Sequence, residues 1–173
     1  MTNSLLFLVL RATHVLFAAV WIGSTAYMLL MLSPVVEEAG PAGGQMMMRL
    51  DRRGLHKYMA AVSMTTIASG LYLLWRFTGG FDPSVAATHA GIVFGVGGAS
   101  GLLAGIIGAT VVGPSGSQIV AIMAQAVAVP DGPAKGALMQ RATSLRQRIK
   151  GGTRAVIALQ ATALLLMSVG HYV

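Results

Sequence analysis

Four histidines are the side chains of this 173-residue chain best suited to hold a metal or a cofactor. Each lies in or beside one of four long apolar stretches, at His14, His56, His89 and His171. A histidine inside a membrane helix is costly to bury, so it usually faces a hydrogen-bond partner, a metal or a cofactor. We expect His14, His89 and His171 to lie toward one side of a bilayer, and His56 toward the other.

Two imidazoles from separate helices could bind the iron of a b-type haem, which accepts axial nitrogen ligands. His14 and His89, expected at matched depth, are the predicted pair of metal ligands, and His171 is the substitute. A haem also carries two carboxylates that need cations or water. Arg11 and Arg76 are the two arginines expected on the same side, and we expect them to bind these carboxylates.

Other residues near the histidines would shape such a site. Arg11, His14 and Trp21 recur at steps of three and four residues along one helix face, which should point into the bundle. Glycines, Gly97 among them, recur every fourth residue in the third apolar stretch. They either let a neighbouring helix approach closely or leave a flat slot for a macrocycle. Both interpretations stand, as does one in which the histidines only bond to neighbouring helices.

Methionine offers a competing metal chemistry, because thioether and imidazole ligands favour Cu(I). The chain has 11 methionines, including the run Met46 to Met48, which should lie on the side opposite His14. Methionine in an apolar helix usually only fills space. The lack of cysteine excludes disulfides, zinc–thiolate sites, covalent c-type haem and iron–sulfur clusters. The five acidic residues all lie outside the apolar stretches, so no hydrolytic site is indicated.

The composition predicts an integral membrane protein, since 55% of the residues are hydrophobic and only 10% are charged. We predict an all-α, four-helix membrane bundle formed by a single domain over residues 1–173. Each apolar stretch is long enough to cross a bilayer. The four spans are expected at residues 4–32, 55–76, 83–112 and 153–173.

The basic residues predict the orientation of this bundle. Ten of the 12 lysines and arginines lie in the segments between the first and second spans and between the third and fourth, or within three residues of them. The positive-inside rule then places both termini outside and both basic segments in the cytoplasm, in the inner (plasma) membrane. The net charge of +7 is therefore attributed to an anionic inner leaflet, and no nucleic-acid partner is expected.

Turn residues and patterning predict where the elements begin and end. The first helix should end before Ser33-Pro34 and the third after Val112, whereas Asp82 should begin the third, with His89 two turns inside. The segment 117–150 should form amphipathic cytoplasmic helices on the inner membrane surface, although a partner protein could use the same face. Its apolar stripe follows steps of four and three residues through Leu138, Ala142, Leu145 and Ile149.

The segment from His14 to Gly23 resembles the first helix of small bacterial membrane proteins of the CopD-like and HemJ-like type. In that helix a histidine is followed seven residues later by tryptophan and then by glycine, as at His14, Trp21 and Gly23. The basic lead-in and threonine-containing helix from Arg49 to Leu74 is similar too, so the resemblance covers about a third of the chain. HemJ-like proteins are haem b protoporphyrinogen oxidases whose first histidine serves the haem. The resemblance implies this role for His14.

The chain departs from the HemJ-like pattern at one functional position. Those proteins carry a lysine near the start of the third helix, where this chain has His89 and no lysine. The departure counts against the specific oxidase activity and leaves haem binding open. CopD-like proteins are linked to copper uptake, so the resemblance implies copper as the alternative to haem.

We therefore expect a b-type haem protein that acts in electron transfer or haem-linked redox chemistry near the outer face. Whether it is an oxidoreductase itself stays open at this stage. A membrane redox partner, a quinone or a second copy of the chain are the partners considered. The alternatives are a copper-handling membrane protein and a cofactor-free structural subunit of a membrane complex.

Overall fold

The computed structural model describes residues 2–170 and Tyr172, so the predicted ligand His171 lies outside the described part. Among the described residues, four helical stretches are long and apolar enough to cross a membrane: Ser4–Glu38, Leu55–Phe77, His89–Ala128 and Pro133–Val169. The protein is therefore an all-α, multi-pass membrane protein, as predicted. The elements in chain order are α1 (Thr2–Tyr27), the π-helix η1 (Met28–Leu32), α2 (Ser33–Glu38), α3 (Gly40–Arg52), α4 (Leu55–Phe77), α5 (Pro83–Ala86), α6 (His89–Ile107), the π-helix η2 (Gly108–Val112), α7 (Gly113–Ala128) and α8 (Pro133–Val169).

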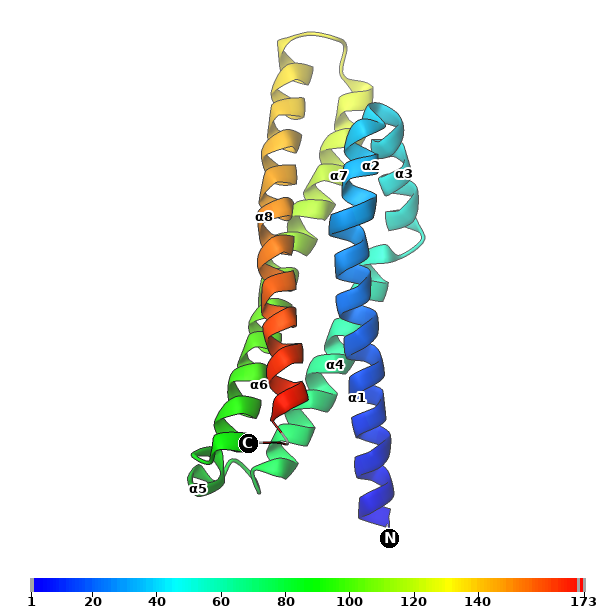
Figure 1. Cartoon of the computed structure of the whole chain (residues 1–173). Coiled ribbons are helices and arrows are strands. Elements are labelled where there is room, and N and C mark those ends of the chain that lie inside the picture. Colours follow the sequence, from blue (N-terminus) through cyan, green and yellow to red (C-terminus); the bar gives the residue numbers. More distant parts are fainter. Residues whose placement is uncertain (1, 171, 173) are drawn as a thin grey trace.

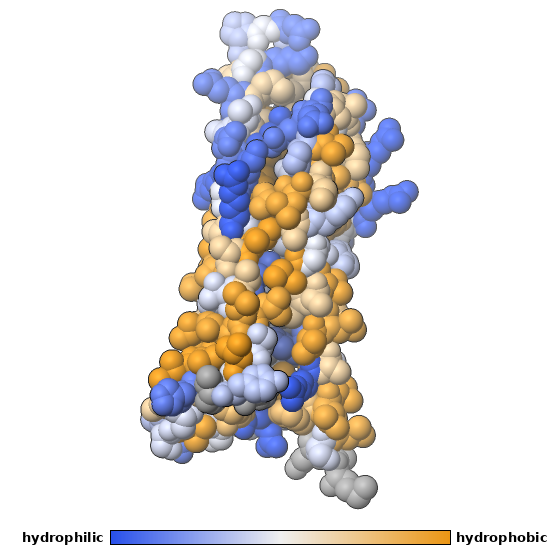
Figure 2. Space-filling view, viewed as in Figure 1, coloured by the Kyte–Doolittle hydropathy of each residue, from blue (hydrophilic) through white to orange (hydrophobic). Residues whose placement is uncertain are grey.

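The long helices form a bundle in which α1 packs on α4, α4 on α6, and α6 on α8 (Figure 1). α1 begins and α8 ends at the same end of this bundle. Apolar side chains cover most of the surface toward that end, whereas polar side chains gather around the opposite end (Figure 2). Large apolar side chains that stand exposed on the outer faces include Leu5, Leu16, Leu30, Leu103 and Leu165. Such faces suit contact with lipid.

Two short π-helices carry the long helices past prolines. The amide of Ser33 donates to the carbonyl of Met28, five residues earlier, and Gly113 donates to Gly108 in the same way. Proline lacks an amide hydrogen and its ring collides with the carbonyl four residues before it. One wider turn ahead of each proline removes that collision while the helix continues. The predicted helix ends at Leu32 and Val112 are therefore wrong.

The connection between the first two spans is almost entirely helical. Only Ala39 separates α2 from α3, despite the glycines and prolines around it. The turn between α3 and α4 falls at Gly54, whose φ of 93° favours glycine.

α7 and α8 form an antiparallel hairpin that the sequence did not predict. The fourth long helix begins at Pro133, far before the expected residue 153. The stripe formed by Leu138, Ala142 and Leu145 packs on α7, through Ile119 and Ile122. α7 thus covers the apolar stripe that was expected to face the inner membrane surface.

The start of the third span is broken into two helices. Asp82 caps α5 as predicted, and its carboxylate accepts bonds from the hydroxyl and the amide of Ser84 at 2.6 and 2.8 Å. These bonds lower the pKa of the Asp82 carboxyl. α5 ends after one turn, and Thr88 caps α6 by accepting from the amide of Gly91 at 3.1 Å. His89 is consequently the first residue of α6 and exposed, not two turns inside a helix.

One packed layer joins all four long helices at mid-length. It consists of Trp21 from α1, Val62 from α4, Ala104 from α6 and Val156 from α8. Ala104 is 0% exposed, so the helices are in close contact at this level. The layer separates the end of the bundle that holds His14 from the end that holds the α7–α8 hairpin.

Candidate functional site

The ring of His14 is held against α4 by its Nδ1 atom. Nδ1 lies 2.9 Å from the carbonyl oxygen of Thr66 and 3.3 Å from the hydroxyl of Ser69. Because a carbonyl oxygen can only accept, Nδ1 carries the hydrogen and donates it. Nε2 is then the nitrogen with the free lone pair. This is the arrangement in which protein histidines bind a metal, since the second hydrogen bond fixes the tautomer and the ring orientation.

Gly70 makes room for this ring. A Cβ atom at Gly70 would lie 2.6 Å from Cε1 of His14, 3.0 Å from Nδ1 and 3.5 Å from Nε2. On α4, each step of four residues advances about 40° around the helix axis. Thr66 faces α1 and Leu74 contacts α6. Around the axis of α4, Gly70 therefore points in a direction between those two. A ring that lies over Gly70 reaches into the interior of the bundle.

Gly101 faces the same interior from α6. Gly97, one turn earlier, packs on α8, where a Cβ would lie 3.3 Å from Met167. Gly105, one turn later, packs on Ile67 of α4. Gly101 lies between these two directions, and no atom lies within 4 Å of the position its Cβ would take. The helix-packing interpretation therefore applies to the predicted site residue Gly97, and the open space lies at Gly101 instead.

His14 and Gly101 lie at about the same depth in the bundle. Gly70, beneath the His14 ring, is the position on α4 level with Gly101. This follows from two contacts between α4 and α6 that bracket the pair, one between Leu74 and Gly98 and one between Ile67 and Gly105. The open space at Gly101 and the ring of His14 therefore lie at the same level of the bundle.

Gln160 brings a buried polar group to this level from α8. Its side chain is 6% exposed, and neither amide atom has a hydrogen-bond partner in the described chain. The contacts of Gly97 with Ala163 and of Gly152 with Ile107 place Gln160 opposite Ser100 and Gly101. An unpaired buried amide costs about 1–3 kcal/mol, so native proteins rarely leave one without a partner or ligand.

The sequence interpretation missed Gln160, although a signal was present. It is the one amide side chain in the charge-free stretch from Ala155 onward. Thr66, Ser69 and Gly70 were less visible, because only the packing of α1 on α4 gives them a role.

The structure does not bring the predicted ligands His14 and His89 together. His89 is exposed at the start of α6, 12 residues before Gly101, which corresponds to roughly 18 Å along the helix. His56 lies toward the other end, where its Nδ1 bonds to Asp51 and its ring packs against Gly116 of α7. Among the described residues, no three histidine or acidic side chains gather into a metal site.

The remaining predicted site residues are placed as follows. Trp21 is 6% exposed and points into the bundle, as expected. Arg11 lies one turn before His14, and Arg76 is next to the last residue of α4; both are exposed. The two arginines thus lie in the half of the bundle that contains His14, where they can meet carboxylates near its end.

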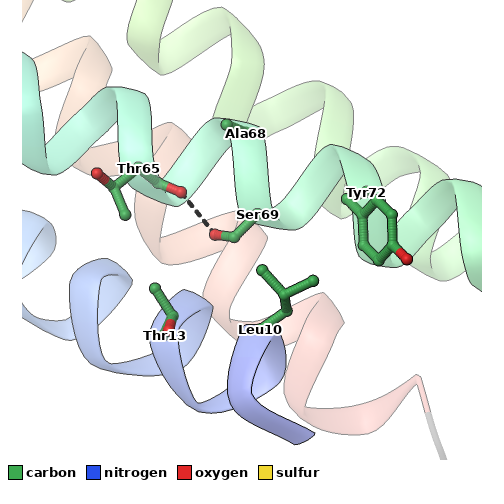
Figure 3. Close-up of a pocket in the computed structure, with 6 residues that line it drawn as sticks. All are labelled: Leu10, Thr13, Thr65, Ala68, Ser69 and Tyr72. Atoms are coloured by element: carbon green, nitrogen blue, oxygen red, sulfur yellow. Dashed lines mark hydrogen bonds between the residues drawn. The ribbon is translucent and has the colours of Figure 1, made fainter. Parts of the chain in front are cut away.

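Among the described residues, cavities open between the helices on both sides of the Trp21 layer. One of about 400 Å³ adjoins the His14 anchor and is lined by Leu10, Thr13, Thr65, Ala68, Ser69 and Tyr72 (Figure 3). In it, the hydroxyl of Ser69 donates to the carbonyl of Thr65 at 2.6 Å, which orients Ser69 beneath the histidine. The other, of about 240 Å³, lies on the far side of the Trp21 layer, and Met28, Met46 and Met59 are among its lining residues. The methionine and histidine groups therefore form no single site.

Comparison with known proteins assigns no relative to this chain. No family model matches it, and neither a curated protein nor a solved structure is similar enough to be matched.

Proposed function

We propose that this protein binds one b-type haem inside the bundle, with His14 as an axial ligand, and acts in electron transfer or haem-linked redox chemistry. The observation that supports it is the Nδ1 hydrogen bond to Thr66, which leaves Nε2 of a membrane-embedded imidazole without a partner among the described residues. Arg11 and Arg76 supply charge for the two haem carboxylates. With the basic segments in the cytoplasm, this site faces the outer side of the membrane.

His14 supplies an imidazole and Arg11 and Arg76 supply cations, which are the donor types that such a group needs. A bound b-type haem supplies a one-electron centre whose potential depends on its axial ligand and surroundings. The carbonyl of Thr66 orients the His14 ring and increases its basicity. Trp21 and Ala104 close the interior toward the cytoplasmic end, which limits the access of water from that side. We place the redox partner, a membrane protein or a quinone, in the same bilayer.

A visible spectrum of the detergent-purified protein tests the proposal. We expect a Soret band that shifts on reduction with dithionite, and a stoichiometry near one haem per chain. His14→Ala should lose most of the haem, whereas the matched control His89→Ala should retain it, because His89 is exposed and distant. Full haem retention in His14→Ala would exclude His14 as a ligand.

Two other outcomes would assign a different function. Copper without a Soret band would favour the copper-handling alternative. Neither copper nor haem would favour a structural subunit of a membrane complex.

A further inference from the structure

Three methionines from three different elements line the cavity of about 240 Å³ on the far side of the Trp21 layer. Met28 is the first residue of η1, Met46 lies in α3 and Met59 lies in α4. These residues are distant from one another in the sequence, and the packing of α3 and α4 at this end of the bundle brings them to one space. Three thioether groups thus meet at the border of a single cavity.

Gap filling does not explain this grouping. Methionine often fills irregular gaps in an apolar core, and a filled gap leaves no cavity beside it. Here about 240 Å³ stays open next to three methionines. The hydroxyls of Ser24 and Tyr58, 3.4 Å apart, join α1 to α4 at the cavity wall, and Met59 packs on the Trp21 layer. The wall is therefore tied together, whereas the flexible thioether side chains can turn toward a ligand.

The chemistry of the lining selects the kind of ion that this cavity can hold. Its other described lining residues are serine, tyrosine and leucine, so it offers no carboxylate, imidazole or thiolate. Mg²⁺ and Ca²⁺ need sites rich in oxygen, and Zn²⁺ takes thiolate, imidazole or carboxylate ligands. Thioether sulfur is a soft ligand that favours Cu(I). A monovalent ion is also less costly than a divalent one to hold among neutral side chains, because the cost of removing an ion from water grows with its charge.

We propose that Met28, Met46 and Met59 bind one Cu(I) ion through their thioether sulfurs in this cavity. Met46 is 44% exposed, so an ion can reach the site from the surface of the bundle. The site contains no histidine and is separated from His14 by the Trp21 layer. It therefore differs from a copper site built on the outer histidines, and it does not depend on the proposed haem.

Anaerobic titration of the detergent-purified, full-length protein with Cu(I), in competition with a chromophoric Cu(I) chelator, tests the proposal. We expect one Cu(I) per chain, and X-ray absorption that shows sulfur as the coordinating atom. Loss of a residue that merely supports a metal ligand weakens binding about 10–100-fold. Met28→Leu/Met59→Leu removes two ligands, so its Cu(I) affinity should fall by at least that range. Leucine keeps the apolar volume, and Met46→Leu, at the exposed position, is the second variant should the double variant not fold.

The matched control is Met31→Leu/Met64→Leu, which removes the same number of sulfurs from the same two elements, η1 and α4. Met31 and Met64 are 62% and 64% exposed and lie outside the cavity lining. The control should bind Cu(I) as tightly as the wild type. Equal Cu(I) affinity in the two double variants would overturn the assignment, as would X-ray absorption that shows only nitrogen or oxygen ligands.

His14→Ala distinguishes the methionine site from copper at the outer histidines. It should keep the Cu(I) affinity of the wild type. Copper that His14→Ala loses and Met28→Leu/Met59→Leu retains would overturn the methionine site. The visible spectrum of the same samples separates this inference from the proposed function. Haem without Cu(I) binding would refute the methionine site alone, whereas Cu(I) bound at the methionines without any haem would refute the haem proposal alone.

Discussion

Replacing Gly70 by alanine should displace the ring of His14 and weaken the site. The new Cβ would lie 2.6 Å from Cε1 and 3.0 Å from Nδ1, well inside ordinary van der Waals contact. The ring must move, and its 2.9 Å bond to Thr66 is then lost or lengthened. Overpacking of this kind costs about 1–3 kcal/mol, and the lost bond adds about 1 kcal/mol. The usual gain for alanine over glycine in a helix, about 0.5–1 kcal/mol, offsets only part of this cost. We expect a net destabilisation of about 1–3 kcal/mol.

Thermal unfolding in detergent and haem content per chain measure the two effects. Gly23→Ala is the matched control, because Gly23 lies within α1, the helix that packs on α4, and its Cβ would meet nothing within 4 Å. That variant should be slightly more stable than the wild type and keep its haem. If Gly70→Ala behaves like Gly23→Ala in both measurements, the described contact between His14 and α4 is not what holds the ring.

Two further substitutions test the other half of the molecule. Leu145 is 8% exposed and lies between α7 and α8. Leu145→Ala should therefore destabilise the hairpin by about 2–5 kcal/mol and speed its proteolysis. The haem content should stay unchanged, because the hairpin lies beyond the Trp21 layer. Proteolysis at the wild-type rate would show that the hairpin does not depend on this contact. Lys150→Ala removes the 3.3 Å ion pair with Glu37, which is partly exposed, so the thermal midpoint should change by less than the equivalent of about 1 kcal/mol. A larger drop in the thermal midpoint would mean that this ion pair contributes more to the packing of α2 on α8 than its exposure indicates.

The apolar spans could be read from the sequence because burying charge in a bilayer is costly, and runs without charge are therefore conspicuous. The helix ends could not, because proline and glycine normally end helices and the π-turns before Pro34 and Pro114 appear only in three dimensions. The apolar stripe through Leu145 was recognised, and it was expected to face the inner membrane surface or a partner protein. Its spacing does not say what covers it, and α7 rather than lipid does so.

The candidate site was predictable only in part for a similar reason. His14 stands out in the sequence because an imidazole within an apolar run needs a partner. Its partners Thr66 and Ser69 lie more than 50 residues away, and only the packing of α1 on α4 brings them together. His89 was misplaced because α5 ends after one turn, so that the helix counted from Asp82 does not exist.

The length of α8 determines how its basic residues meet the membrane. Its 37 residues correspond to about 55 Å, whereas the hydrocarbon core is about 30 Å thick. With Arg154 at the lipid boundary, Lys150 stands about 6 Å above it and Lys135 about 28 Å above it. The Debye length at physiological ionic strength is about 8 Å. In that arrangement we expect dissolved ions to shield the charge at the tip from the phospholipids, so that only the base of the hairpin would contribute to attraction by an acidic bilayer.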